Sequence, residues 1–149
     1  MEGAPGLRLG VLASGDEHLV ASVSKGLPIW NINSFAEFYL QICEKYKADF
    51  AEAMERFYPV RDELHSELQK IPYMKPIPSR ANYITCKLNG NLSARELTVF
   101  LLNRYNILVR DVSGKNGVAG EYIRVAVKTP EENARLISAL LTLRSAQRQ

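Results

Sequence analysis

The segment Glu121-Tyr122-Ile123-Arg124-Val125-Ala126-Val127 decides how the C-terminal half of this chain folds. From its second residue onward it consists mostly of β-branched and aromatic residues, a composition that predicts a strand. Shortly after it, Thr129 and Glu132 have the spacing of a capping box, in which hydroxyl and carboxylate satisfy free amides of a first helical turn. Pro130 fits the first helical position, where a missing N–H costs nothing. The sequence therefore predicts a strand followed by a helix that ends at about Ala146.

The same reasoning extends upstream to an α+β unit. A helix from Ser93 to Tyr105 begins at another capping box, Ser93/Glu96, and its apolar spacing predicts a buried face. Strands are expected at Tyr83 to Leu88 and at Ile107 to Val112, and a glycine-rich loop, Gly114 to Gly120, precedes the strand described above. The order β-α-β-β-α predicts the fold class α+β, a small sandwich of one sheet covered on one face by helices. The helix residues expected in the core are Leu97, Phe100 and Leu101.

A long helix is expected ahead of this unit. Apolar residues recur at every third or fourth position from Phe35 to Ile71, and Ser34 with Glu37 has capping-box spacing. Pro59 within this run lacks a backbone donor and clashes with the preceding turn, which predicts a kink. A long kinked helix is suited to connecting two domains. The prolines that follow predict a loop; they are Pro72, Pro76 and Pro78.

The N-terminal residues are expected to form a strand and a helix outside the α+β unit. Leu7 to Ala13 has the apolar character of a buried strand. A helix from about Asp16 to Lys25 follows it, behind a capping box at Ser14/Glu17, and Gly26 ends this helix.

Composition and charge argue against several classes of protein. The hydrophobic content of 46% and the charged content of 23% are those of a globular protein. The net charge of +3 comes from scattered basic residues, a weak argument for nucleic-acid binding, and no apolar run reaches the length of a membrane span. Cys43 and Cys86 lack metal-ligand spacing, so we expect two buried free thiols, a cytoplasmic location and no bound metal. His18 and His65 stand alone and are expected to face solvent without a catalytic role.

Arginines that stand in otherwise apolar strands are candidates for binding an anion. Arg8 lies among Leu, Gly and Val residues, where a guanidinium needs an anionic partner to offset its desolvation. Arg124 projects from the face of its strand opposite to its two apolar neighbours, and Arg110 lies on the preceding strand. If Arg110 and Arg124 point at one spot, they would clamp a phosphate. The alternatives are a solvated arginine at a strand end or edge for Arg8 and Arg124, and a salt bridge to Asp111 or a helix carboxylate for Arg110.

Four motifs of this chain resemble those of one enzyme family. They are Pro5-Gly6-Leu7-Arg8-Leu9-Gly10, Trp30-Asn31-Ile32-Asn33-Ser34, the strand segment quoted first, and Thr129-Pro130-Glu131-Glu132-Asn133. The whole chain resembles the C-terminal part of a fold type I pyridoxal-phosphate aminotransferase of the class I/II kind, similar to histidinol-phosphate aminotransferase and threonine-phosphate decarboxylase. Asp111-Val112-Ser113 departs from the Asp-Cys-Ser of phosphate-recognising members.

The resemblance implies a domain organisation and site residues. Residues 1–32 would be a remnant strand and helix of the large cofactor-binding domain, and residues 33–149 the C-terminal small domain with the long interdomain helix. Arg8 would bind the phosphate of pyridoxal 5'-phosphate. Arg124 would bind the carboxylate or phosphate of the substrate, with Arg110 as a second anion-binding group. The functional expectation is the C-terminal domain of an aminotransferase that acts on an amino acid or amino phosphate.

The resemblance also places the Schiff-base lysine directly before Met1, so the chain is expected to be inactive alone and to contain no catalytic residue. One alternative is a fragment of a lyase like threonine-phosphate decarboxylase. The other is a free-standing binding or assembly module with a closed surface. The expected partner is a small-molecule amino acid or amino phosphate, not nucleic acid or a membrane. Trp30 is expected to be a packing anchor and Asn33 a residue at a helix start. We also expect a homodimer, or association through exposed apolar surface.

Overall fold

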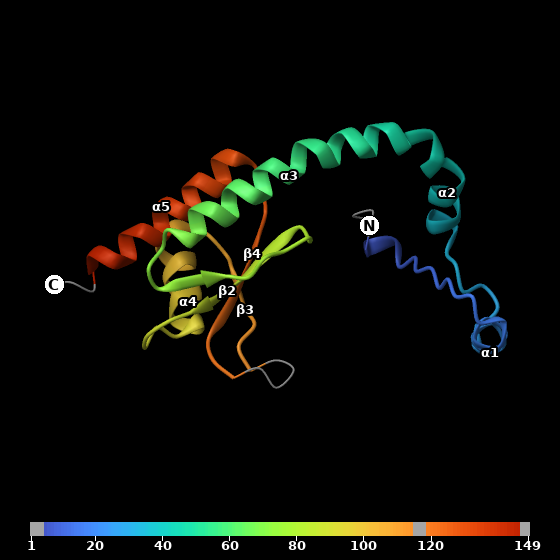
Figure 1. Ribbon diagram of the computed structural model, residues 1–149, viewed down its shortest axis with the longest axis horizontal. Coiled ribbons are helices and arrows are strands. Elements are labelled where there is room, and N and C mark those ends of the chain that lie inside the picture. The colour runs from blue at the N-terminus through green and yellow to red at the C-terminus, as the bar shows by residue number, and fades with distance from the viewer. Residues whose placement is uncertain (1–4, 115–118, 147–149) are drawn as a thin grey trace. The chain divides into compact units, whose positions relative to one another are not determined.

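The computed structural model describes residues 5–114 and 119–146. The chain divides into two compact units, Met1–Met54 and Glu55–Gln149, which are described separately. The helix α3 (Lys47–Gln69) contributes residues to both. The remaining elements of the second unit, labelled in Figure 1, are β1 (Met74–Pro76), β2 (Tyr83–Leu88), α4 (Ala94–Tyr105), β3 (Arg110–Asp111), β4 (Tyr122–Ala126) and α5 (Pro130–Ala146).

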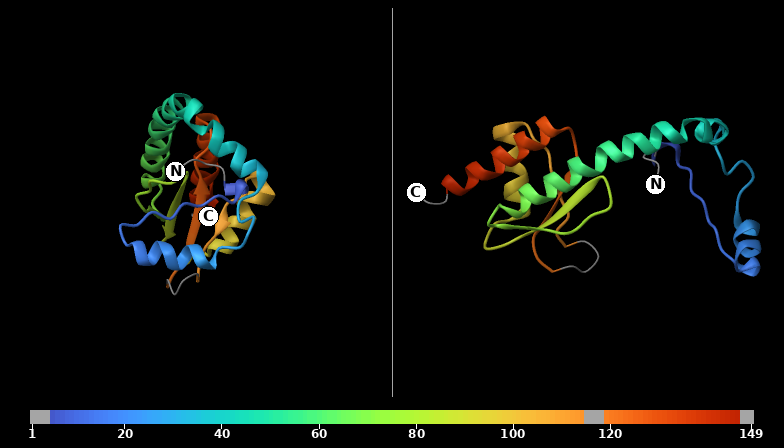
Figure 2. Two further views of the ribbon diagram at one scale, coloured as in Figure 1. Left: turned by 90° about the vertical axis from the view of Figure 1, so that its right-hand side faces the viewer. Right: turned by 45° about the horizontal axis from the view of Figure 1, so that its top comes forward.

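The second unit is a sheet with helices on one face. Its four strands are antiparallel in the order β1-β2-β4-β3, so the chain crosses from β2 through α4 to the far edge before β4 fills the centre. The views of Figure 2 show α4 and α5 beside the sheet. The predicted α+β class is confirmed, and so are the strand at Tyr83–Leu88 and the helices α4 and α5.

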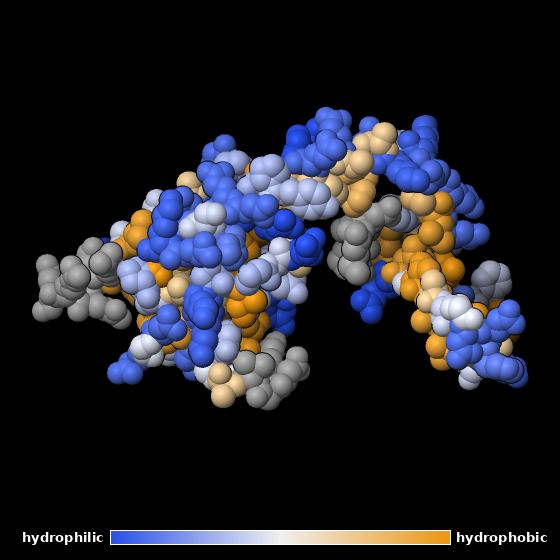
Figure 3. Space-filling model, viewed as in Figure 1, coloured by the Kyte–Doolittle hydropathy of each residue, from blue (hydrophilic) through white to orange (hydrophobic). Residues whose placement is uncertain are grey.

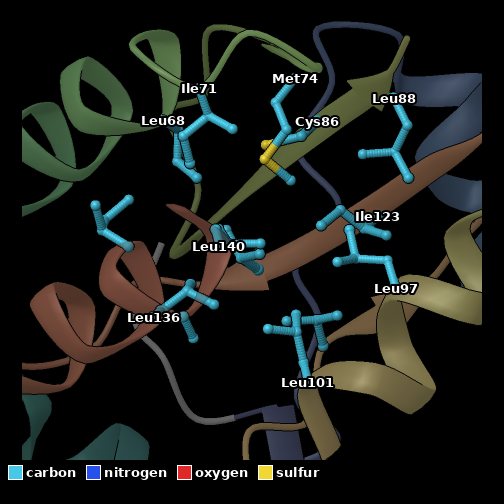
Figure 4. Close-up of a cluster of buried hydrophobic side chains, with 14 of the residues drawn as sticks. Leu68, Ile71, Met74, Cys86, Leu88, Leu97, Leu101, Ile123, Leu136 and Leu140 are labelled. Carbon is cyan, nitrogen blue, oxygen red and sulfur yellow. The ribbon is translucent and has the colours of Figure 1, made fainter. Parts of the chain in front are cut away.

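One apolar core holds the helices to the sheet. Side chains alternate along β2 and β4, so that Ile84, Cys86, Ile123 and Val125 are buried and their neighbours face the other side. The predicted core residues Leu97 and Leu101 are fully buried, while Phe100 packs at the margin. Figure 4 shows the leucines that meet the sheet, which are Leu68 of α3, Leu97 and Leu101 of α4, and Leu136 and Leu140 of α5.

The start of α5 is a complete capping box, as predicted. The Thr129 amide donates to Glu132 Oε2 at 3.5 Å, and the Glu132 amide donates to Thr129 Oγ1 at 3.3 Å. Buried Asn133 adds a second link, because its side chain donates to the Lys128 carbonyl and accepts from the Lys128 amide. The strand-to-helix junction is therefore fixed by contacts within a few residues.

The start of α4 has the serine half of the predicted capping box. Ser93 Oγ accepts from the Glu96 amide at 3.5 Å. The helix is capped by Asn106, whose left-handed φ of 54° lets its amide donate to carbonyls of the last turn. The next amide, of Ile107, also bonds back, to Leu101 O. Because Ile107 belongs to the helix end, the predicted strand Ile107 to Val112 is reduced to Arg110–Asp111.

The strand β1 lies where only a loop was predicted. Met74 and Pro76 are buried and Lys75 faces outward. Proline cannot donate to a ladder, but an edge strand tolerates it because one side of that strand needs no partner. Tertiary packing beside β2 therefore makes a strand from a proline-rich segment, and the order becomes β-β-α-β-β-α.

The first unit contains a 3-10 turn (Pro5–Leu7), α1 (Glu17–Gly26), α2 (Ser34–Cys43), a second 3-10 turn (Glu44–Tyr46) and the start of α3. The predicted strand Leu7 to Ala13 is wrong, because no strand forms there. A strand requires a neighbour for its backbone donors and acceptors, and no described segment pairs with it.

The helix starts of the first unit are asparagine and aspartate caps. Asp16 accepts from the Leu19 amide at 3.1 Å, and Asn33 accepts from the Ala36 amide at 3.0 Å. The capping boxes predicted at Ser14/Glu17 and Ser34/Glu37 are therefore wrong, whereas the helix-start role of Asn33 is confirmed. Each of these caps has a short side chain whose oxygen accepts from the free amide three residues further on.

The single long helix predicted from Phe35 to Ile71 is also wrong. The 3-10 turn at Glu44–Tyr46 separates α2 from α3, and Pro59 lies inside α3, which continues past it. Apolar spacing persists through a 3-10 turn, so the periodicity alone does not reveal the break.

None of the helices within the described residues is long and apolar enough to span a membrane.

The cysteines are free, but only Cys86 is buried, since Cys43 is half-buried. His18 is exposed as predicted. His65 is half-buried, which corrects the expected solvent exposure, and its Nε2 atom is buried without a hydrogen-bond partner.

Stability is expected to fall in alkali because of Cys86. Burial raises the pKa of its thiol from 9.0 to about 12. Between these values the unfolded chain loses a proton that the folded chain keeps, so stability is intact below pH 9 and decreases up to about pH 12. Each pH unit in this window costs about 1.4 kcal/mol. We expect the urea midpoint to drop less in Cys86→Ala than in the parent between about pH 8 and about pH 10.5. Equal drops would contradict the prediction.

Candidate anion-binding site

Arg110 and Arg124 are direct cross-strand partners on β3 and β4. Partners in an antiparallel pair project from the same face, with Cβ atoms about 4.5–5.5 Å apart. The neighbours of Arg124 along β4, Ile123 and Val125, are buried in the core. Both arginines therefore belong to the sheet face opposite to the helices.

An open hollow of about 550 Å³ lies at this pair. The guanidinium of Arg124 stacks over the ring of Tyr83, with 4.6 Å between Cζ and the ring centroid. Such a cation–π contact restrains the guanidinium and leaves its N–H groups available at the edge. The hollow is lined by Asn82, Tyr83, Leu108, Val109, Arg110, Asp111, Arg124 and Ala126.

The arginine pair carries two like charges that the described residues do not neutralise. No ion pair within the described part of the chain involves Arg110 or Arg124. Asp111, the alternative partner predicted for Arg110, instead accepts from the amide of Ser113 at 2.8 Å. Like charges directly opposite each other destabilise a sheet, and an anion between them would remove the repulsion and accept charge-assisted hydrogen bonds from both.

Arg8 belongs to the first unit and is exposed, at a left-handed φ of 56° after the first 3-10 turn. A phosphate has three acceptor oxygens, so this arginine alone does not make a complete phosphate site. The role of Arg8 remains a prediction.

Two further expectations concern the segment before α2. Trp30 is 92% exposed, so the packing role expected for it is wrong among the described residues. Asn33 has a second contact besides its cap, because its Nδ2 donates to the Leu7 carbonyl at 2.8 Å.

No cluster of His, Cys, Asp and Glu that would suit a metal ion is found in the described ranges.

Sequence reasoning missed Tyr83 and Asn82 as neighbours of the arginine pair. The alternation of β2 already put Tyr83 on the face opposite to Ile84, but only the pairing of β2 with β4 brings it beside Arg124. No local signal identifies such a neighbour.

The comparisons with known proteins agree with this architecture. A family model described as aminotransferase class I and II matches residues 2–140. The chain is 32% identical over 93% of its length to CMP-5'-(3-aminopropyl)phosphonate synthase of Streptomyces rubellomurinus. It is 32% identical over 95% of its length to L-serine phosphate decarboxylase of Sulfurospirillum multivorans. The crystal structure of histidinol-phosphate aminotransferase from Clostridium acetobutylicum superimposes with a TM-score of 0.85 at 26% identity, covering 97% of this chain.

The chain spans only part of these proteins. It covers 22% of the synthase, 36% of the decarboxylase and 43% of the aminotransferase chain. Class I and II aminotransferases generally depend on pyridoxal phosphate. The extent of the family match and the shared α+β fold lead to one conclusion: this chain belongs to the class I and II aminotransferase family.

Proposed function

We propose that this chain is the C-terminal part of a pyridoxal-phosphate-dependent aminotransferase that acts on an amino acid or amino phosphate. Arg124 and Arg110 hold the anionic group of the substrate on the open face of the sheet. The observation that carries this proposal is their cross-strand pairing beside an open hollow, with no carboxylate bound to either among the described residues. Two guanidinium groups that face one position suit an anion with more than one acceptor oxygen.

The names of the relatives support a phosphate-bearing substrate. Serine phosphate and histidinol phosphate, named for the decarboxylase and the aminotransferase, are both amino compounds with a phosphate group. A phosphate dianion offers three acceptor oxygens and a second charge that a carboxylate lacks. The arginine pair therefore favours an amino phosphate over a simple amino acid.

The proposed reaction also needs a cofactor. Pyridoxal phosphate, when bound, supplies an electron sink for the amino group transfer. From this chain we assign only Arg8 to it, at the phosphate. The resemblance puts the Schiff-base lysine ahead of Arg8, outside the 149 residues. We therefore propose that this chain alone does not transaminate, and turnover by the purified chain would contradict this.

A decarboxylase is the second candidate. It is favoured by the 32% identity to L-serine phosphate decarboxylase. The two reactions differ in which bond of the substrate is aligned with the cofactor ring, and both retain the same anion site. Product analysis on a longer protein that contains this chain distinguishes them, because only the lyase releases carbon dioxide.

The anion site itself is testable with inorganic phosphate. We expect the side-chain NMR signals of Arg110 and Arg124 to shift on titration, and Arg124→Ala to weaken binding by about tenfold, because a hydrogen bond to a charged group contributes about 1.5–3 kcal/mol. Arg124→Lys keeps the charge but loses the planar fork, so it should restore affinity only in part.

The matched control is Arg95→Ala, an exposed arginine on α4. Like Arg124→Ala, it removes one positive charge from the second unit, but Arg95 does not line the hollow. It should therefore leave phosphate binding unchanged. An equal loss in Arg95→Ala and Arg124→Ala would show that phosphate responds to net charge alone, and the proposed site would be wrong.

A further inference from the structure

We infer that Ser113 and Glu121 are positioning residues that set Arg110 opposite Arg124. This inference rests on the proposed anion site, because it concerns how that site is held together. Neither residue lines the hollow. Ser113 follows the C-terminal end of β3, and Glu121 directly precedes β4. A hydrogen-bond network there joins these strands to the start of α4.

The hydroxyl of Ser113 extends the pairing of the two strands beyond β3. The ladder ends with the Val112 amide donating to the Tyr122 carbonyl at 3.0 Å. The Tyr122 amide then donates to Ser113 Oγ at 2.9 Å, and this hydroxyl lies 3.3 Å from the Tyr122 carbonyl. The Ser113 hydroxyl thus takes the place of a backbone carbonyl as the acceptor for the Tyr122 amide.

Glu121 anchors this arrangement to the helix layer. Its Oε2 atom accepts from the Ala94 amide at 2.6 Å and lies 3.4 Å from Ser113 Oγ. Ala94 begins α4, where free amides and the positive end of the helix dipole favour a carboxylate. The start of β4 is therefore tied to a helix that is itself packed in the core.

The arginine pair depends on this anchor because β3 is short. It contains two residues, Arg110 and Asp111, and so forms few ladder bonds of its own. A slip of one residue turns every side chain of a strand to the opposite face. Arg110 would then leave the open face, and one arginine would remain at the hollow. The network at Ser113 and Glu121 excludes this slip.

The test is a double-mutant cycle on phosphate binding in the full 149-residue chain. We expect Ser113→Ala to weaken binding about fivefold, as much as Arg110→Ala, and the double variant to be no weaker than either. Ser113→Thr, which keeps the hydroxyl, should restore binding. Glu121→Gln should weaken binding less than Ser113→Ala, because the amide oxygen still accepts from Ala94. Ser66→Ala removes a comparable hydroxyl bond on α3 and serves as the control.

The outcomes separate this inference from the proposed site. The positioning role is wrong if phosphate shifts the arginine signals but Ser113→Ala binds phosphate as the parent does. It is also wrong if the losses of phosphate affinity in Ser113→Ala and Arg110→Ala multiply in the double variant. If phosphate shifts neither arginine in the parent, the anion site fails, and hydrogen exchange at the Val112 amide decides the inference. Faster exchange in Ser113→Ala than in Ser66→Ala would still support it, and equal exchange would overturn it.

Discussion

Replacing Leu101 by alanine is expected to destabilise the second unit by about 2–5 kcal/mol, the range for a large apolar side chain removed from a packed core. Leu101 is fully buried on α4 and lies in the cluster that joins the helices to the sheet (Figure 4). The loss combines transfer free energy with the cavity that remains. Because domains are stable by only about 5–15 kcal/mol, the variant should unfold at a much lower urea concentration.

The next residue along the helix provides the control. Leu102 is 42% exposed, so Leu102→Ala removes the same atoms from a partly solvated position. Its effect should stay within about 0.5 kcal/mol, as for other surface substitutions. Urea unfolding followed by circular dichroism measures both. Similar midpoints for the two variants would mean that α4 does not pack on the sheet as described.

Self-association of the purified chain is the second large effect that we expect. Of the described residues up to Tyr46, only Ala36 is buried, while Ile29, Trp30 and Phe35 are at least 80% exposed. Figure 3 shows apolar residues at the surface of this first unit. Soluble monomers rarely expose apolar patches above about 300–600 Å². We therefore propose association through this surface, which also argues against a free-standing module with a closed surface.

Sedimentation velocity with a hydrophobic dye measures this association. Serine at Ile29, Trp30 and Phe35 together should shift the chain toward monomer and reduce dye fluorescence, because apolar area contributes about 25 cal/mol per Å² on burial. Leu108→Ser is the control, since Leu108 is 75% exposed but belongs to the second unit. A parent chain that sediments as a monomer without binding dye would contradict the prediction and favour the module.

The two strand predictions that failed, at Leu7 to Ala13 and at Met74–Pro76, share a physical cause. Leu7 to Ala13 has strand composition, yet a strand needs a paired neighbour, which no described segment provides. Met74–Pro76 has loop composition, yet it pairs with β2 and buries two of its side chains. In both cases the composition of the segment did not decide whether a strand formed, because a strand depends on a partner far away in the chain.

The sequence by itself determined the helices α4 and α5, the strands β2 and β4, and the face from which Arg124 projects, because capping and side-chain alternation act between residues a few positions apart. Only the tertiary structure decided that Arg110 lies directly opposite Arg124 and that Tyr83 stacks on its guanidinium. Strand register depends on hydrogen bonds and packing between segments far apart in the chain, and no pattern within either segment specifies it.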